Sequence, residues 1–387
     1  VLILLALIGV IAYRHSTGKD LEKYEASFFD VFDTQTQIIG YASSKEQFSE
    51  QMSLIKDKFQ YYNDLYDIYH DYEGMNNIKT INDNAGIQPV KVDEEIIELL
   101  KLGITMDEKT DGNMNIAMGS VLSIWHDYRE AGSEDPDSAE LPPMDELEKA
   151  AEHTDIHDIV IDEEASTVYL TDPDMLLDVG SIGKGYAVQK VAEYAKNELG
   201  IQYMLFSVGG NVCAIGGHPH GSALAVGIQN PDVESDQAYI KKVEVQDLSV
   251  VTSGNYQRYY TVDGKRYCHI INQDTLMPAD NFSSVTIITN DSGMADAYST
   301  AVFNMPLAEG MEFVNQLDGV SAKWKGLDVN VHFQGVGKST YFINGSTVYM
   351  FSGGNSDGDG WGNVMKEMAE GNRWILGVNE DPNAEYP

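Results

Sequence analysis

Basic residues are scarce in this chain of 387 residues, which has 25 Lys and Arg against 61 Asp and Glu and a formal net charge of −36. Nucleic acids are bound largely through Lys and Arg contacts to phosphates, so this balance argues against non-specific nucleic-acid binding. It argues equally against docking on anionic lipid through basic patches. The charge instead predicts a well-solvated, acidic surface.

Cysteine is also rare, with Cys213 and Cys268 as the two examples. Two cysteines are too few for the disulfide framework of a small secreted domain or for a four-thiolate zinc site. At most they form one disulfide. The chain must therefore obtain its stability from a hydrophobic core, and its apolar fraction of 43% is sufficient for one.

The N-terminal apolar run is too short to cross a bilayer. Val1–Tyr13 contains no charged residue, and Arg14 and Lys19 follow it, whereas a membrane-spanning helix needs about 20 apolar residues. We interpret residues 1–19 as the remnant of a signal sequence or membrane anchor, with a buried strand or helix as the alternative. An anchored or exported protein on the extracytoplasmic face of the cell membrane would follow.

The order of the predicted elements favours an α+β fold. Apolar periodicity predicts helices over residues 45–72 and 93–110, and a loop rich in Asn and Asp over residues 76–86. Most of the later strands are separated by glycine turns, without regular βαβ repetition. We expect a single large domain over residues 20–325, followed by a divergent and partly flexible stretch over residues 326–387.

A glycine-rich turn over Leu177–Ala187 is the first motif that could carry chemistry. It reads LDVGSIGKGYA and places Lys184 among three glycines, between a strand and a helix. Glycine lets backbone N–H groups approach a phosphate, and a helix N-terminus adds positive potential. The spacing matches neither the phosphate loop of nucleotide hydrolases nor the dinucleotide-binding fingerprint. An ordinary strand-to-helix turn is the alternative.

Three further motifs follow in the chain. Ser207–Asn211 (SVGGN) ends a strand with a turn that can expose backbone donors, and His269 in a strand-like segment can titrate near neutrality as a general base. Asp296 and Thr300, in ADAYSTA, share one face of a predicted helix and offer the oxygen ligands that Mg²⁺ prefers. Taken singly, each motif also has a purely structural explanation: a tight turn, a core histidine or a helix cap.

Together, these motifs resemble the ApbE family of FAD:protein FMN transferases. The chain carries D-x-G-S-I-G-K-G-Y-A, S-V-G-G-N, S-G-x-Y-x-R, H-I-I and A-D-A-x-S-T-A in the family's order over roughly residues 25–320. The resemblance implies a mixed α/β, T-fold-like domain. It also implies a Mg²⁺-dependent reaction in which a Thr or Ser hydroxyl of an acceptor flavoprotein attacks FAD, keeps FMN as a phosphoester and releases AMP.

The resemblance also implies roles for individual residues. His269 would act as the catalytic base or position it. Asp296, Thr300 and the backbone carbonyl of Ser181 would hold the metal. The residues implied in FAD binding are Tyr72, Met114, Asn115, Ile116, Lys184, Gly209, Gly210, Asn211 and Arg258.

Two departures from the family pattern concern the site. After its histidine the family usually continues Ile-Ile-Asp-Pro and then Thr-Gly, whereas this chain has Asn272 and Gln273, then Thr275 and Leu276. The family's early Met-Gly-Thr is replaced by residues 32–34, Phe-Asp-Thr. Two other functions therefore stay open: hydrolysis of FAD to FMN and AMP, and flavin binding by a surface protein without catalysis.

Overall fold

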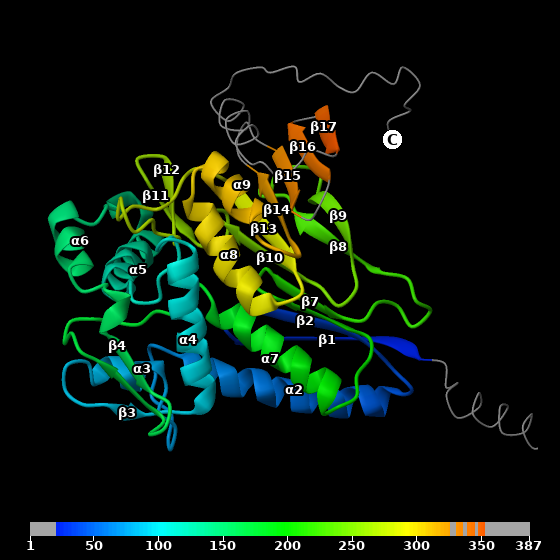
Figure 1. The fold of residues 1–387 in the computed structure, drawn as a ribbon, viewed down its shortest axis with the longest axis horizontal. Helices are drawn as coiled ribbons and strands as arrows, with labels where there is room; N and C mark the ends of the chain where they lie inside the picture. The colour runs from blue at the N-terminus through cyan, green and yellow to red at the C-terminus, as the bar shows by residue number, and fades with distance from the viewer. Residues whose placement is uncertain (1–20, 326–329, 336–338, 345–346, 353–387) are drawn as a thin grey trace, which may run out of the picture.

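The computed structural model describes residues 21–325, 330–335, 339–344 and 347–352 (Figure 1). The helices are α2 (Lys45–Tyr66), α3 (Ile78–Asp83), α4 (Glu94–Lys109), α5 (Gly119–Glu134), α6 (Met144–Ala151), α7 (Gly183–Asn197), α8 (Ser292–Asn304) and α9 (Leu307–Asn315), with short 3₁₀ turns at Pro136–Ser138 and Ile156–Asp158. The strands are β1 (Glu22–Val31), β2 (Thr34–Ala42), β3 (Val90–Lys91), β4 (Ile159–Asp162), β5 (Thr167–Leu170), β6 (Met204–Val208), β7 (Asn211–Ile215), β8 (Leu224–Gln229), β9 (Tyr239–Val245), β10 (Ser249–Gly254), β11 (Tyr259–Val262), β12 (Lys265–Cys268), β13 (Ser284–Thr289), β14 (Val320–Lys325), β15 (Asn330–Gly335), β16 (Ser339–Asn344) and β17 (Thr347–Ser352).

One large antiparallel sheet organises the molecule. Its strands lie in the order β1-β2-β6-β7-β10-β13-β14-β15, and every neighbouring pair is antiparallel. Since parallel βαβ units would give parallel pairs, the sheet confirms the α+β prediction. β15 extends the sheet beyond residue 325, where the sequence analysis ended the main domain.

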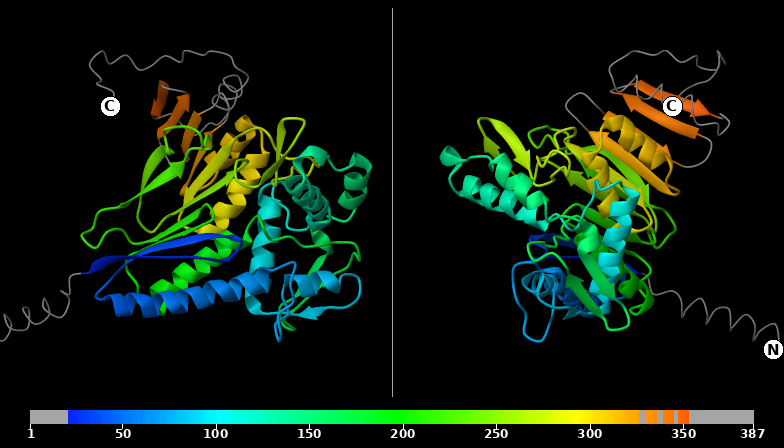
Figure 2. Two further views of the ribbon diagram at one scale, coloured as in Figure 1. Left: turned by 180° about the vertical axis from the view of Figure 1, so that it is seen from behind. Right: turned by 60° about the vertical axis from the view of Figure 1, so that its left-hand side comes forward.

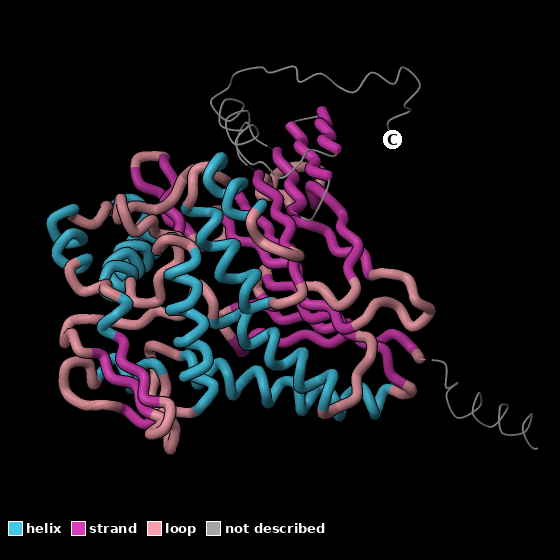
Figure 3. The backbone as a smooth tube through the Cα atoms, viewed as in Figure 1, coloured by secondary structure: helices cyan, strands magenta, loops and turns pink. Residues whose placement is uncertain are grey.

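The two faces of this sheet are covered differently. Helices α2, α7 and α8 pack on one face over the main core, and the β8–β9 hairpin covers part of the other face (Figures 2 and 3). Alternation along the strands makes this possible, because adjacent residues point to opposite faces. In β10, for example, Val251 joins the main core, whereas Val250 packs under the hairpin.

A second apolar cluster forms a lobe beside the helical layer. α5, α6 and the β11–β12 hairpin contribute to it, with Trp125, Leu147 and Tyr260 buried at its centre. The Trp125 indole N–H donates to the Leu276 carbonyl at 2.9 Å, which fastens the lobe to the loop that follows β12. Figure 1 shows this lobe on the left of the view, next to α4 and α8.

Several predicted element boundaries were wrong. The helix predicted over residues 45–72 ends at Tyr66, and the loop predicted over residues 76–86 contains α3. α3 forms because Asn77 and Thr80 make a reciprocal capping box at its first turn. The helix predicted over residues 93–110 is confirmed as α4, which begins after the Asp93 cap.

The predicted N-terminal anchor, residues 1–19, lies outside the described residues. Within the described part of the chain, no helix combines the length and apolarity needed to span a bilayer. Cys213 and Cys268 are both free and buried, so the one possible disulfide does not form.

The contact between α7 and α8 depends on a glycine. A Cβ atom at Gly185 would lie far inside van der Waals distance of the Ser292 carbonyl oxygen and of Asp296 Cβ. Gly183, one half-turn earlier, is different, because its nearest side-chain atom would be Val179 Cγ2 at 3.5 Å. Close approach of the two helices therefore requires glycine at position 185 but not at position 183.

We expect Gly185→Ala to lower the free energy of unfolding by roughly 2–3 kcal/mol, because the helices must separate to admit the methyl group. Gly183→Ala, the matched control, should be neutral or slightly stabilising, because alanine is the better helix former. Guanidinium-induced unfolding of both variants checks this. Equal stability of the two variants would contradict the close-packing interpretation.

Candidate active site

The glycine-rich turn at the start of α7 brings a carboxylate and an ammonium group together. Asp178 Oδ1 accepts from the Gly180 N–H at 2.8 Å, and Lys184 Nζ lies 3.4 Å from the Gly180 carbonyl oxygen. Burial raises the pKa of the Asp178 carboxyl, and the Gly180 N–H with the nearby His126, Lys184 and Arg129 opposes this shift. Asp178 therefore lies inside the site, although its role was not predicted from the sequence.

Asp296 connects this turn to α8. Its side chain is 6% exposed, and its Oδ2 accepts from the Gly185 N–H at 2.7 Å and lies 4.0 Å from Lys184 Nζ. The helices run antiparallel, because Ser292 N–H reaches Gln189 whereas Asp296 meets Gly185. Thr300, one turn after Asp296 and partly exposed, therefore lies toward the start of α7.

The predicted metal ligands fit a hard divalent cation. Asp296 supplies a buried carboxylate, and Thr300 and Ser181 would supply a hydroxyl and a carbonyl oxygen, the donors that Mg²⁺ takes in proteins. The Lys184 ammonium group lies within 4.0 Å of both the Gly180 carbonyl oxygen and the Asp296 carboxylate. These two oxygens therefore already have a cation beside them. A separate group, His153, Asp172 and Asp174, has ligand atoms within 4.8 Å of one another, but it includes none of the predicted ligands.

His269 is held in the tautomer that a base requires. Its Nδ1 lies 3.2 Å from the Arg258 carbonyl oxygen, which can only accept, so the proton is on Nδ1. Nε2 of the neutral ring then carries the free lone pair. Burial lowers the pKa of His269 to about 3, with further lowering by Arg258, Lys184 and Arg129. The ring is therefore neutral at physiological pH and has a lone pair on Nε2, but a pKa this low makes it a weak base until a ligand changes its surroundings.

Gly209, Gly210 and Asn211 lie at a junction of three segments. Both glycines have positive φ (+49° and +95°), and a side chain on Gly209 would collide with Thr34. Arg258 Nη2 lies 3.5 Å from the carbonyl oxygen of Phe32, in the same turn as Thr34. This places the variant Phe-Asp-Thr sequence of residues 32–34 beside residues predicted to bind FAD.

Asn211 has an unused donor at this junction. The residue is 1% exposed, and its amide Nδ2 has no hydrogen-bond partner among the described residues. A buried donor without a partner costs about 1–3 kcal/mol. The amide is enclosed by protein in this structure, so the role of Asn211 in binding FAD stays a prediction.

The segment Met114, Asn115 and Ile116, predicted to bind FAD, is anchored in the core. Ile116 is fully buried and its carbonyl oxygen accepts from the Asp178 N–H at 2.9 Å, so it presents no surface to a ligand here, and Met114 is 2% exposed. Ser181 Oγ donates to the Met114 sulfur at 3.3 Å, which joins a predicted metal ligand to a predicted FAD-binding residue. Asn115 is committed to local structure, because it donates to the Thr154 carbonyl and accepts from the Ala117 N–H.

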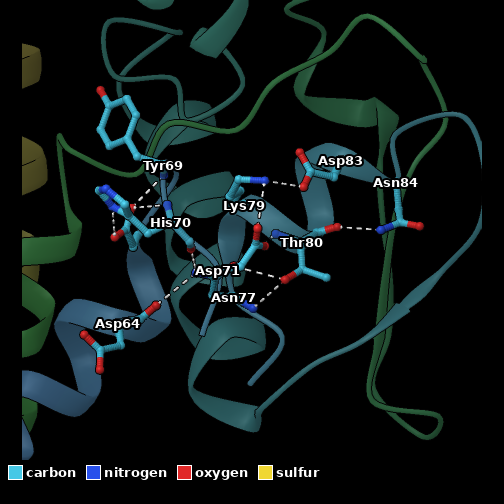
Figure 4. A network of polar contacts seen from close by, with 10 residues as sticks. Asp64, Tyr69, His70, Asp71, Asn77, Lys79, Thr80, Asp83 and Asn84 are labelled. Carbon is cyan, nitrogen blue, oxygen red and sulfur yellow. Dashed lines mark hydrogen bonds and ion pairs between the residues drawn. The ribbon is translucent and has the colours of Figure 1, made fainter. Parts of the chain in front are cut away.

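Tyr72 was predicted to contact FAD from the first helix, but it lies in the loop that follows α2. Its hydroxyl donates to Asp67 at 2.8 Å. Asn77 pins the same loop by donating to the His70 carbonyl at 2.8 Å, and Figure 4 shows the ring of Tyr69 directed away from this polar network. Tyr69 is 53% exposed and is affected electrostatically by Asp178, Arg129 and Arg258, so it is the aromatic ring of this loop that faces the site.

The loop after His269 keeps an unusual backbone despite its altered sequence. Leu276 has φ = +56°, the left-handed conformation that glycine adopts without strain, and glycine is the residue that the family pattern has there. Asn272 Oδ1 accepts from the N–H groups of Asp274 and Thr275. The Leu276 side chain is buried with Trp125, which offsets the conformational cost.

The glycine-rich turn, the Asp296 helix and His269, which follows β12 rather than lying in a strand as predicted, are thus close to one another. The sequence model of the ApbE family matches residues 32–324. This chain belongs to the ApbE family. A relative from Klebsiella pneumoniae (strain 342), named FAD:protein FMN transferase, is 28% identical over 293 residues, which cover 76% of this chain and 88% of the relative. The protein of that name from Treponema pallidum (strain Nichols) is 32% identical over 63% of this chain and 69% of its own length.

Solved structures agree with this family assignment. The ApbE protein of Thermotoga maritima superposes with a TM-score of 0.68 at 28% identity and covers 78% of this chain and 94% of its own. The flavin transferase ApbE from Vibrio cholerae gives 0.65 at 20% identity over 86% and 97% of the two chains, a likeness of fold. The mixed α/β domain expected from the resemblance is therefore confirmed.

The lowered pKa of His269 predicts a pH dependence of stability. Between about pH 3 and the ordinary value of 6.5, the unfolded chain binds a proton at His269 that the folded chain does not, so the free energy of unfolding falls as the pH drops through this window. Between pH 7 and pH 5, His269→Gln should lose roughly 2 kcal/mol less stability than the wild type. Denaturant titrations at both pH values check this, and equal losses would contradict the pKa assignment.

Proposed function

We infer that this chain transfers FMN from FAD to a Ser or Thr hydroxyl of an acceptor flavoprotein and releases AMP. The observation that carries this is the environment of His269: its Nδ1 bonds to the Arg258 carbonyl, which leaves the lone pair on Nε2, and Lys184 and Arg258 lie close enough to lower its pKa. Membership of a family whose relatives bear the name FAD:protein FMN transferase supports the same conclusion. The hydroxyl that attacks FAD belongs to the acceptor protein.

The proposed reaction is a phosphoryl transfer. The acceptor hydroxyl oxygen attacks the phosphorus of the FMN half of FAD, His269 Nε2 takes its proton, and the bond from that phosphorus to the bridging oxygen breaks so that AMP leaves. Lys184 places a positive charge beside the glycine turn. The Gly180 and Gly185 N–H groups are already bonded to Asp178 and Asp296, so the Lys184 ammonium group is the donor that we propose for the pyrophosphate.

We propose Mg²⁺ as the cofactor, held by Asp296, Thr300 and the Ser181 carbonyl. When bound, it would neutralise charge that develops on the phosphoryl oxygens. Asp296 is the one carboxylate among these ligands, so its loss should affect metal affinity more than loss of either neutral oxygen. The membrane-anchored location stays a prediction from residues 1–19.

The assay mixes the purified protein, FAD, Mg²⁺ and a flavin-acceptor domain. We expect AMP and an acceptor that stays fluorescent after denaturation. Asp296→Asn should lower the rate by roughly 100-fold or more at limiting Mg²⁺, whereas Asp318→Asn removes a carboxylate from the exposed surface and should leave the rate unchanged.

Two outcomes would overturn this proposal. AMP release at the same rate without acceptor, with the acceptor left unlabelled, would mean that the protein hydrolyses FAD. Tight FAD binding with no AMP, unchanged by His269→Ala, would mean a flavin-binding protein without catalysis.

A further inference from the structure

Two residues on α5 form a fixed pair that the proposed reaction does not use. Arg129 Nη2 lies 2.8 Å from Nδ1 of His126, three residues earlier on the same helix. A guanidinium group can only donate, so Nδ1 must accept and the proton of the neutral imidazole is on Nε2. His126 therefore presents a donor at Nε2, the opposite of His269, whose Nε2 carries a lone pair.

The imidazole of His126 also packs against an exposed aromatic ring. The ring centroids of His126 and Tyr69 are 5.4 Å apart, and the planes are inclined by 33°. Tyr69 is 53% exposed, although it comes from a loop that Asn77 and Asp67 hold in place. The two rings form an aromatic shelf, a name we use for His126 and Tyr69 together.

The aromatic shelf belongs to the candidate active site. Arg129, whose side chain is 18% exposed, lowers the pKa of His269. His126 and Arg129 also lower the pKa of Asp178. The Asp178 carboxylate raises the pKa of Tyr69, whereas Arg129 and Arg258 lower it, so these charges also lie near the Tyr69 ring. The shelf, the predicted base and the glycine turn therefore lie near one another, although they come from the loop after α2, from α5, from the segment after β12 and from the start of α7.

We propose that His126 is a further substrate-binding residue, and that Arg129 is a positioning residue that acts through it. A planar nitrogen heterocycle of the dinucleotide would lie on the aromatic shelf and accept a hydrogen bond from His126 Nε2. Both the flavin and the adenine ring have this chemistry: a flat π-face with acceptor atoms at its edge. The inference rests on the proposed function, because it takes FAD as the substrate.

Equilibrium binding of FAD, FMN and ADP, followed without acceptor, tests the role of His126. His126→Ala removes the ring and the donor, and we expect FAD to bind roughly 10-fold to 30-fold more weakly. His126→Phe keeps a ring without the donor and should give an intermediate loss. Asp127→Asn, at the exposed neighbouring position, is the matched control and should bind like the wild type.

The shorter ligands identify which ring the shelf holds. Weakened FMN binding with unchanged ADP binding assigns the flavin, and the reverse assigns adenine. If all three ligands bind His126→Ala and His126→Phe within twofold of the wild type, the shelf is only a packing contact and the inference is overturned. That result would leave the proposed function standing whenever the wild type still labels the acceptor.

A double-mutant cycle tests the positioning role of Arg129. Arg129→Lys keeps the charge but loses the planar donor, and should weaken FAD binding about 3-fold to 5-fold in the wild type. In the His126→Ala background the same change should cost less than twofold, because its partner is gone. Equal losses in both backgrounds would overturn the claim that Arg129 acts through His126.

Discussion

One hydrogen bond joins the two halves of the candidate site. The Gly185 N–H at the start of α7 donates to Asp296 Oδ2 on α8, 111 residues later in the chain. The bond is possible because position 185 has no side chain, which lets the Asp296 backbone and carboxylate approach α7. The same contact sets the relative positions of Lys184, which approaches the carboxylate, and Thr300, one turn further along α8. Without it, the glycine turn, which contains Ser181, would not be held against Asp296 and Thr300.

The sparse basic residues acquire a different meaning in this setting. A net charge of −36 disfavours any anionic ligand at long range. Within the site, however, the cations Lys184, Arg258 and Arg129 all lower the pKa of His269. An anionic dinucleotide therefore meets locally positive potential inside an acidic protein. Burial is the main cause of the low pKa of His269, and the same cations lower it further, so the charges that attract the substrate also favour the neutral ring.

The sequence allowed the fold class and the main motifs to be predicted for physical reasons. Apolar alternation predicted strands, glycine spacing marked the turn before α7, and Asp296 with Thr300 fell on one helix face. Motif order then linked segments that local pattern alone could not connect. Periodicity failed where a cap decided the outcome: α3 forms from a capping box inside a stretch rich in Asn and Asp.

The residues missed from the site share one property, which is that tertiary packing assigns their place. Tyr69 and Tyr72 have similar local sequence surroundings, but the hydrogen bond from Tyr72 to Asp67 leaves Tyr69 as the exposed ring. His126 and Arg129 lie on α5, which the sequence analysis did not predict as a helix, so their pairing at i and i+3 was not visible. Asp178 did have a signal, because it opens the glycine motif, but burial is what identifies it as part of the site.

Anomalous diffraction from a crystal grown with FAD and Mn²⁺ would test the central claim most directly, because Mn²⁺ accepts the same oxygen ligands as Mg²⁺. The account predicts a peak about 2 Å from an Asp296 carboxylate oxygen and from the Thr300 hydroxyl, beside the FAD pyrophosphate. A peak confined to His153, Asp172 and Asp174, with FAD bound and no metal at Asp296, would contradict it.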